Sequence, residues 1–409
     1  MTSNFKFTLL SSVAAAAVTV MAAGTASATN GMLPHCVGTA KCGMGGAGSA
    51  VARSAVDAAA QNPALAARMG NAYQVNLGWF WADVKGNSAQ DGDLLTESSS
   101  ADSFPNGSFG VNYVIDADTA FNISVVPGGG GASKWPTSRT TNFGGTGNDQ
   151  EVTYEMMYVQ PSYAKKMGAA TYGVGGILSR ATMKTDSAQG TFLGSGVEDN
   201  KETFYGVGFQ VGGVWDIAQG GSFALNLRSP VWHQDTGVYD GVVFNDPIDT
   251  PMQVQAGIAF DITDQTMVAA DVKWVNWSGP NTIGTQPNVS CTACRGFGWD
   301  DQIIVMLGVE HDISDALTLR AGFNHGNSPI GSGHVLANYL FPAIVETHYT
   351  VGASYNVGNG MELGASAYYA PEKSMTDDGS LFGANATGNG GTTLSHSQKG
   401  FQLSFSNDF

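Results

Sequence analysis

The sequence predicts an all-β protein: a fourteen-stranded antiparallel transmembrane β-barrel with an N-terminal hatch, or plug, in the lumen. Three observations support this prediction. Apolar and polar residues alternate over many segments, the connections between these segments are alternately short and long, and the composition is unusual. The 409-residue chain contains 55 glycines and 20 Phe, 13 Tyr and 8 Trp residues, but only 13% of it is charged, against a usual ~25%.

The same composition excludes other classes of protein. An α-helical membrane protein needs apolar runs of ~18–20 residues, and none follows residue 28. A disordered chain would contain fewer aromatic residues. The net charge of −16 argues against a nucleic-acid partner, because nucleic-acid-binding domains are normally basic.

The amino terminus is typical of a secretory signal peptide. Lys6 gives a positive start, residues 9–23 are mostly apolar, and Ala26-Ser27-Ala28 fits a cleavage site for small residues. We therefore expect three parts: a signal peptide at 1–28, a hatch at 29–70 on the periplasmic side, and an outer-membrane barrel at 71–409. A membrane anchor is the alternative for the first segment.

The four cysteines follow this segment. An exported chain meets an oxidising compartment, so disulfides are expected; the candidates are Cys36, Cys42, Cys291 and Cys294. The Cys291–Cys294 pair has the spacing of redox, haem and zinc motifs, but it lacks the βαβ context, the following His and a second pair. A disulfide within a loop is the better interpretation, and the sequence predicts no metal and no cofactor.

Period-two alternation is clearest at 252–260, where Val254 and Ile258 alternate with Gln253 and Gln255. Successive strand residues point to opposite faces, so each such strand has an apolar face and a polar face. Fourteen runs of this kind are expected: 72–86, 107–116, 119–127, 151–164, 170–184, 202–217, 221–233, 251–263, 265–278, 300–313, 316–328, 344–358, 360–374 and 393–409.

Tight turns such as 116–118 and 314–315 alternate with long polar connections such as 87–106 and 279–299. This is the plan of a bacterial outer-membrane barrel, with its polar face inward. A soluble β-sandwich is the alternative, but it rarely needs such long strands. Aromatic residues near strand ends suit the two membrane interfaces: Trp79, Phe80, Trp81, Trp274, Trp277, Tyr368 and Tyr369.

A simple pore would not need the segment from 29 to 70, which precedes the first expected strand. It contains Gly43, Gly45, Gly46 and Gly48 in a GxGxxG pattern. A dinucleotide site would need a preceding strand and a βαβ unit, neither of which is expected. A flexible linker is a second alternative. The Ala-rich stretch 47–60 permits helix, and its small residues would pack closely, so we expect a plug inside the lumen.

This glycine run, followed by Asp57 and by Asn62, Pro63 and Ala64, resembles the amino-terminal hatch of the FadL/TodX family. Members of that family are outer-membrane transporters of long-chain fatty acids and hydrocarbons. Residues 251–278 and 299–329 resemble two hairpins of the family, and the chain ends on Phe409 after alternating apolar residues, like the signal read by the barrel assembly machinery. The resemblance implies a fourteen-stranded barrel in which those hatch residues form the gate.

The resemblance also implies a gap in the barrel wall, because the family's third strand is kinked. Here that strand runs into Pro127 and Gly128; proline cannot donate to a β-ladder and glycine marks bends. A simple strand end is the alternative. Two apolar pairs in polar loops, Phe192-Leu193 and Leu381-Phe382, are candidates for substrate capture.

Charged residues at inward positions belong in the lumen, because a charge in the lipid midplane costs ~2–4 kcal/mol. They could brace the barrel, or Arg228, Lys273 or Arg320 could bind a ligand carboxylate, with Glu346 as a further lumen candidate. The inward positions are expected to hold Glu155, Arg228, Asp271, Lys273, Glu310, Arg320 and Glu346.

The function predicted is passive uptake of hydrophobic molecules, long-chain fatty acids or related hydrocarbons, by a monomer in the outer membrane of a Gram-negative bacterium. Its surroundings would be outer-membrane lipid and lipopolysaccharide. A general porin is the main alternative. An outer-membrane enzyme is less well supported, because no local motif pairs any of the seven histidines with Ser or Asp. A structural or adhesive barrel is the last alternative.

Overall fold

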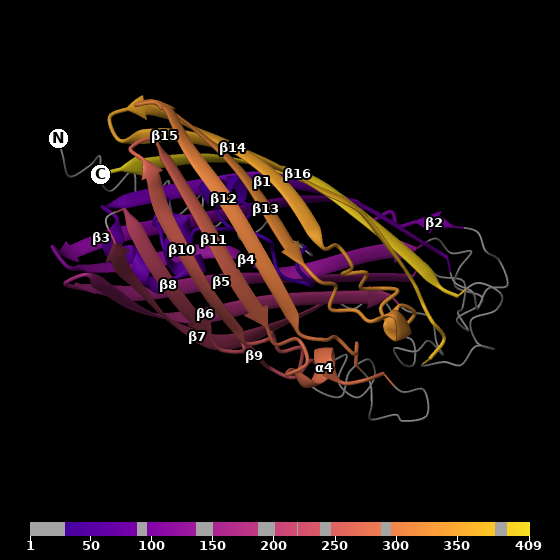
Figure 1. Ribbon diagram of the computed structural model, residues 1–409. Coiled ribbons are helices and arrows are strands. Elements are labelled where there is room, and N and C mark those ends of the chain that lie inside the picture. The colour runs from indigo at the N-terminus through magenta and orange to yellow at the C-terminus, as the bar shows by residue number, and fades with distance from the viewer. Residues whose placement is uncertain are drawn as a thin grey trace.

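In the computed structural model, fourteen long antiparallel strands form a closed barrel (Figure 1). The structure describes residues 29–87, 96–135, 150–186, 201–218, 220–237, 247–287, 296–380 and 391–409. The strands of the barrel are β1 (Ala72–Asn87), β3 (Ser103–Asp116), β4 (Thr119–Trp135), β5 (Gln150–Met167), β6 (Ala170–Asp186), β7 (Glu202–Ala218), β8 (Gly221–Arg228), β10 (Gln253–Thr263), β11 (Thr266–Val275), β12 (Gln302–Ser314), β13 (Leu317–Gly326), β14 (Thr347–Gly358), β15 (Met361–Thr376) and β16 (Thr393–Asp408).

The barrel closes where its last strand meets its first. β16 pairs with β1 along its whole length, from Ala72 opposite Asp408 to Asn87 opposite Thr393. Two short strands extend the sheet: β2 (Glu97–Ser98) pairs with β1, and β9 (Trp232–His233) pairs with β7. The predicted strand number and closed antiparallel topology are confirmed.

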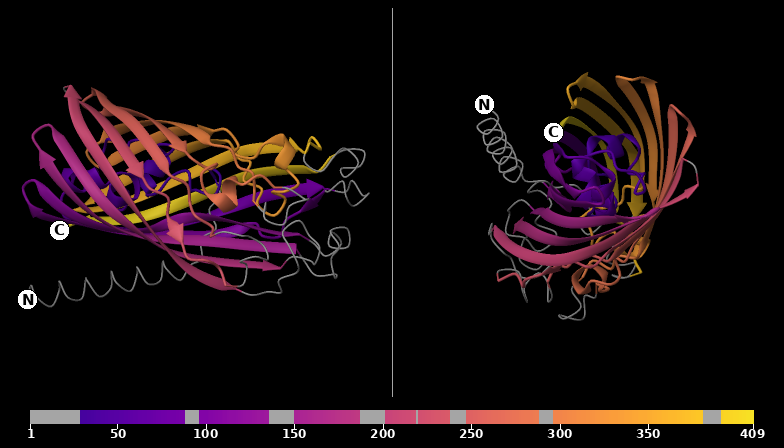
Figure 2. Two further views of the ribbon diagram at one scale, coloured as in Figure 1. Left: turned by 90° about the horizontal axis from the view of Figure 1, so that it is seen from below. Right: turned by 90° about the vertical axis from the view of Figure 1, so that its left-hand side faces the viewer.

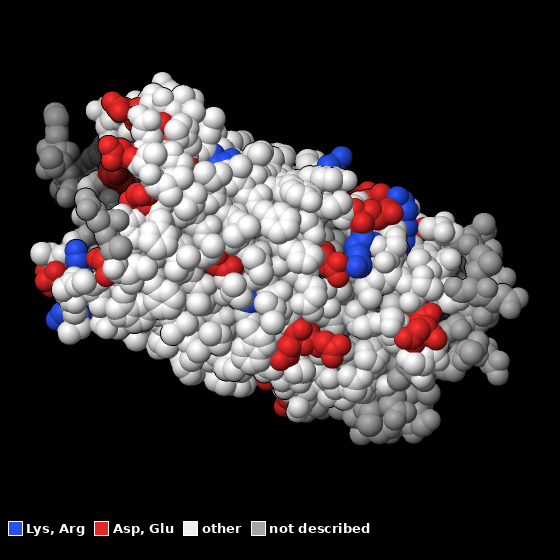
Figure 3. Space-filling model, in the orientation of Figure 1, with Lys and Arg blue, Asp and Glu red and all other residues white. Residues whose placement is uncertain are grey.

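The alternation predicts the two faces of the wall correctly. In β10, Gln253, Gln255 and Ala259 are buried inside the barrel, whereas Ile258 is 41% exposed on the outside. The outer face shows mostly uncharged residues across its middle, with Lys, Arg, Asp and Glu concentrated toward the ends (Figure 3). An outward apolar face is what a closed sheet in hydrocarbon requires.

Several aromatic positions were predicted wrongly. Trp79, Trp81 and Tyr369 are exposed on the outer face as expected. Phe80 is buried because it stands on the opposite face of β1, and Trp277 lies after the end of β11 and is fully buried against Trp299. Tyr368 also points inward, where it contacts the rings of His35 and His348.

The wall departs from the predicted strand limits at two places. β4 does not end at Pro127 but continues to Trp135, because a bulge at Gly128 lets the strand resume its pairing with β5. β8 ends at Arg228, so the predicted run to 233 is interrupted before β9.

Residues 29–70 lie inside the barrel, where Figure 2 shows them in indigo within the ring of strands. They form three short helices: α2 (Thr39–Gly43), α3 (Ala55–Gln61) and the 3-10 helix η1 (Pro63–Arg68). The predicted helix at 47–60 is limited to α3, which Ser54 caps by accepting the Asp57 N–H. Two more short helices, α4 (Asn281–Gly284) and η4 (Ser332–His334), lie in the long loops.

No helix in the described ranges is both long enough and apolar enough to span a membrane.

Candidate functional site

The glycine run of the amino-terminal segment is a tight turn pressed against the barrel wall. Gly45, Gly46 and Gly48 have φ values of 68°, 86° and 102°, a region that side chains with a Cβ rarely adopt. A Cβ on Gly45 would lie 2.6 Å from the Phe323 carbonyl oxygen. The glycines therefore let the backbone of this segment pack directly against the backbone of the wall, as expected for a plug.

The wall provides matching glycines opposite this segment. A Cβ on Gly322 would lie 2.1 Å from the carbonyl carbon of Met44, and one on Gly110 would lie 2.4 Å from the Ala55 carbonyl oxygen. Gly43 and Gly352 would collide in the same way. The backbones of plug and wall thus approach more closely than any side chain would permit.

Asp271 on β11 fixes the turn to the wall. Its carboxylate accepts hydrogen bonds from the backbone N–H of Gly48 (2.5 Å) and Ser49 (3.1 Å), and from the Ser49 hydroxyl. Gln255 donates to the same carboxylate at 3.2 Å. This inward charge therefore anchors the plug.

Asn62, Pro63 and Ala64 form a second anchor. The Asn62 side chain accepts the Ala64 N–H at 3.0 Å and donates to the Gly213 carbonyl of β7 at 3.3 Å. Pro63 occupies the first turn of η1, where its missing N–H costs nothing. Wall glycines again make room: a Cβ on Gly173 or Gly212 would overlap this tripeptide.

Two buried charges lie within the plug itself. Lys41 donates to the carbonyls of Gly48 and Val51, and burial lowers its pKa to about 8. Asp57 accepts from the Ser54 hydroxyl at 2.6 Å, and burial raises the pKa of its carboxyl above the usual value. Both groups hold the internal shape of the plug.

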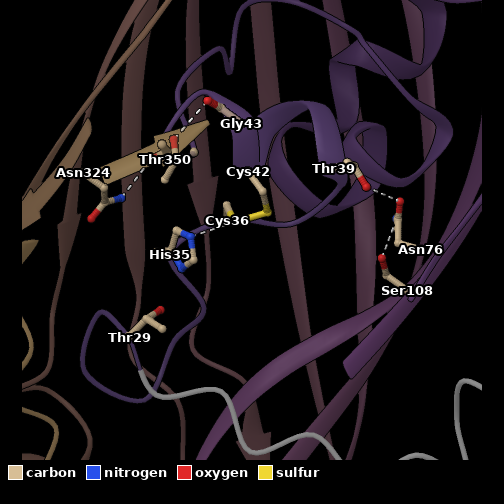
Figure 4. The surroundings of a disulfide bond; sticks show 12 residues. Thr29, His35, Cys36, Thr39, Cys42, Gly43, Asn76, Ser108, Asn324 and Thr350 are labelled. Atoms are coloured by element: carbon tan, nitrogen blue, oxygen red, sulfur yellow. Dashed lines mark hydrogen bonds between the residues drawn. A yellow bond between two sulfur atoms is a disulfide. The ribbon is translucent and has the colours of Figure 1, made fainter. Parts of the chain in front are cut away.

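A disulfide joins Cys36 to Cys42 and ties the start of the plug to α2 (Figure 4). Beside it, the His35 ring stacks on His348 of β14 with centroids 4.7 Å apart. Burial lowers the pKa of His35 to about 3, so the imidazole is neutral. Cys291 and Cys294 lie outside the described residues, as do Phe192-Leu193 and Leu381-Phe382.

Most of the inward charges are engaged with one another or with the plug. Glu310 binds Arg320 and Arg53, each with an N–O distance of 2.7 Å. Arg320 also donates to the Ser354 hydroxyl, so it braces the wall.

One of the charges predicted to lie in the lumen is elsewhere, and another lies at the rim. Glu346 lies where the β13–β14 connection enters β14, and it pairs with Lys373 at 2.8 Å. Glu155 faces outward, because the inward face of β5 is formed by its even-numbered residues, which are all buried from Val152 to Ala164. A shift of one residue moves the side chains of a strand to its opposite face, so an expected register that misses one bulge assigns them to the wrong face.

Arg228 and Lys273 line a small cavity between plug and wall. The cavity has a volume of about 60 Å³. Arg228 donates to the Ala60 carbonyl at 2.7 Å and to Gln210. Among the described residues, neither cation has an ion-pair partner. The other lining residues include His35, Cys36, Gln61, Pro127, Gly128, Asn226, Gln253 and Gln255.

The wall is unpaired next to this cavity. The β3–β4 ladder ends where Phe109 faces Val125, although β3 begins at Ser103 and β4 continues to Trp135. Beyond that point the β3 ladder is with β1 and the β4 ladder is with β5. In the described ranges, the two sides meet again only near the rim, where the Ser100 N–H donates to the Lys134 carbonyl at 2.8 Å and the Lys134 N–H donates to the Ser99 hydroxyl at 3.0 Å. The bulged part of β4 turns to the plug, since Gly130 donates its N–H to the Met32 carbonyl at 2.9 Å.

The β13–β14 connection is a feature that the sequence analysis did not identify. Residues 335–345 are all buried, in a loop where polarity and exposure are the rule. The only sequence signal is their apolar composition, which resembles a strand but lacks period two.

A closed outer-membrane barrel with a plugged lumen is the architecture of a channel. Its sequence matches the model of the outer membrane protein transport protein family (OMPP1/FadL/TodX) over residues 19–390. The chain therefore belongs to this family of outer-membrane transport channels, which are not enzymes. No curated protein matches the chain significantly.

Solved structures agree on the fold. The P. putida toluene transporter TodX has a TM-score of 0.71 at 14% identity, and the match covers 92% of this chain and 99% of that one. A Pseudomonas aeruginosa FadL homologue has a TM-score of 0.67 at 15% identity, covering 93% and 100%. The Ralstonia pickettii toluene transporter TbuX has a TM-score of 0.66 at 16% identity, covering 92% and 99%.

Proposed function

We propose that this protein takes up hydrophobic molecules passively, by a gated route that leaves the barrel sideways between β3 and β4. The observation that carries this proposal is the interrupted β3–β4 ladder beside the cavity at Pro127 and Gly128. Backbone groups without partners are costly in hydrocarbon, so an interruption in a transmembrane wall calls for a functional reason. Lateral exit into the membrane is such a reason for an apolar solute.

The closed lumen supports a gated route over an open pore. The cavity of about 60 Å³ is far smaller than the ~300–1,000 Å³ of ordinary ligand pockets. The plug is therefore in a closed position, and Gly43, Gly45, Gly46, Gly48, Asp57, Asn62, Pro63 and Ala64 make up the gate that must yield. A general porin would have a wide, wet lumen, which the buried plug opposes.

Capture would begin among the long loops. A groove of about 240 Å³ lies between the β8–β10 and β11–β12 connections, and its apolar lining includes Trp232, Pro247, Met252 and Pro280. It is a candidate entry site for an apolar solute.

The substrate class we favour is a carboxylic acid with a long apolar chain. Arg228 and Lys273 face the cavity without an ion-pair partner in the described part of the chain, and a carboxylate would neutralise them. The relatives TodX and TbuX are toluene transporters, so a neutral aromatic hydrocarbon is the second candidate. Replacing both cations with Met should lower oleate uptake and leave toluene uptake unchanged; equal loss of both would reject the carboxylate role.

Deleting Gly128 tests the exit. The deletion removes the β4 bulge and lets the strand run straight, so the β3–β4 ladder should extend and uptake of labelled oleate or toluene should fall toward background. The matched control deletes Ile262, which removes the bulge between Asp261 and Thr263 of the continuous β10–β11 ladder. Normal uptake by the Gly128 deletion, with the barrel intact by its heat-shifted gel mobility, would reject lateral exit at this gap.

A further inference from the structure

We infer that the β13–β14 connection, residues 327–346, is a movable outer cap that must leave the barrel mouth before a substrate can enter. This inference rests on the proposed function, because it concerns how an apolar solute reaches the lumen. The connection belongs to the end of the barrel with long loops, which in outer-membrane barrels is the extracellular end. The cap and the plug would then be two gates in series.

The cap is an apolar insert in the mouth. Val335 and Ile344 are fully buried, and the residues between them are all buried as well. Tyr339 stacks on Trp135 of β4 with centroids 4.3 Å apart, and Phe341 lies edge-on to Tyr154 of β5. A loop that only joined two strands would not need to bury this apolar surface.

A small number of polar contacts hold the cap in place. Asn338 is fully buried; it accepts the Trp299 indole N–H at 2.7 Å and donates to the carbonyls of Phe297 and His334. Its amide therefore links the cap to the β11–β12 connection. We call this set of bonds the Asn338 latch.

Three further bonds tie the cap to the rest of the rim. The Ser133 hydroxyl of β4 donates to the Leu340 carbonyl at 2.7 Å. The Leu336 N–H donates to the Asp377 carboxylate at 2.9 Å, and His396 of β16 donates to the Pro342 carbonyl at 2.8 Å. The buried part of the cap, residues 335–345, is thus attached around the mouth by side chains of the rim, which can exchange to water. The start of the cap is held by backbone contacts: Ile330 forms an isolated β-bridge with Trp299, and the Asp300 N–H donates to the Pro329 carbonyl.

The closed cap covers two polar groups of the wall. The indole N–H of Trp135 and the hydroxyl of Tyr154 are buried beneath it without a hydrogen-bond partner in the described part of the structure. Burying such groups unpaired is unfavourable. Water or a passing ligand would satisfy both groups once the cap lifts, so the closed state is opposed by the residues that it covers.

A disulfide across the cap tests the inference. Ser133→Cys with Leu340→Cys places two thiols where the hydroxyl and the Leu340 backbone already touch. The matched control is Thr376→Cys with Thr393→Cys, which joins directly paired residues of β15 and β16 at the same rim without touching the cap. Initial uptake of labelled oleate and toluene is measured in cells before and after reductant, with cross-linking verified by mass spectrometry and wild type treated in parallel.

We expect the oxidised cap staple to reduce uptake of the transported probe to background, with recovery on reduction, while the rim staple transports like wild type. A verified cap staple that transports like wild type overturns the inference.

A second variant keeps the inference testable without transport. Asn338→Ala breaks the latch, and in the purified protein it should increase hydrogen–deuterium exchange at the buried backbone of residues 335–345 several-fold over wild type. If wild type carries neither probe, the proposed function fails on that result alone. An unchanged exchange rate at residues 335–345 in Asn338→Ala rejects the cap, whatever the transport result.

Discussion

Single glycines determine how closely the backbone of the plug packs against the barrel wall. Gly322 is the clearest example, because a Cβ there would lie 2.1 Å from Met44 and 2.3 Å from Gly45, both backbone atoms that cannot rotate away. Gly322→Val should therefore displace the plug and raise conductance in planar bilayers. Gly176→Val is the control, since a Cβ at Gly176 meets only a Pro161 side-chain atom at 3.7 Å. Equal conductance of the two variants would contradict this packing.

Asp271 is the residue whose loss should loosen the plug most. Asp271→Ala leaves the N–H groups of Gly48 and Ser49 buried without this acceptor, at a cost of about 1–3 kcal/mol for each group. We expect protease access to the plug in detergent-purified protein. Asp264→Ala, at an exposed turn, should leave the plug protected; if both variants stay protected, Asp271 is not an anchor.

His35 makes plug attachment depend on pH. Its pKa is about 3 in the folded protein and 6.5 ordinarily, so a released plug binds more protons than a seated one between these values. Attachment is therefore unaffected above pH 7 and weakens as pH falls below 6.5, by about 2 kcal/mol at pH 5. Conductance should rise on acidification in wild type and less steeply in His35→Gln; identical slopes would exclude His35.

As an element, the plug should be separable from the barrel, because its only covalent link to the wall is the chain at 69–71. Removing residues 29–64 is expected to keep the barrel, whose strands pair only with one another, and to change uptake of labelled oleate. A deletion variant that forms a barrel and transports at the wild-type rate would show that the plug is no gate.

The elements were predictable where one physical rule dominates. Lipid outside and polar contacts inside impose period two on each strand, so the strand number and the faces of β10 followed from the sequence. The disulfide between Cys36 and Cys42 followed from a different rule, the oxidising compartment that an exported chain enters. β4 was cut short because Pro127 and the glycines have the composition of a loop; only the pairing with β5 reveals a bulge. The cap at 327–346 was missed because a buried loop has no periodicity, and Phe80 was misplaced because an aromatic pair does not say which member faces lipid.

At the scale of the whole molecule, a closed wall, a seated plug and a capped mouth enclose a cavity of only about 60 Å³ beside Arg228 and Lys273 in the described part of the chain. Such a barrel excludes polar solutes, and an interruption in its wall opens toward lipid. The central claim is therefore one of selectivity: apolar solutes cross and sugars do not.

One uptake measurement tests that claim directly. Initial rates for labelled oleate, toluene and arabinose are compared in a Gram-negative strain lacking this protein, with and without a plasmid that restores it. We predict that restoration increases the rate for at least one of the two hydrophobic solutes and leaves arabinose unchanged. An increase for arabinose, with neither hydrophobic solute affected, would contradict the account.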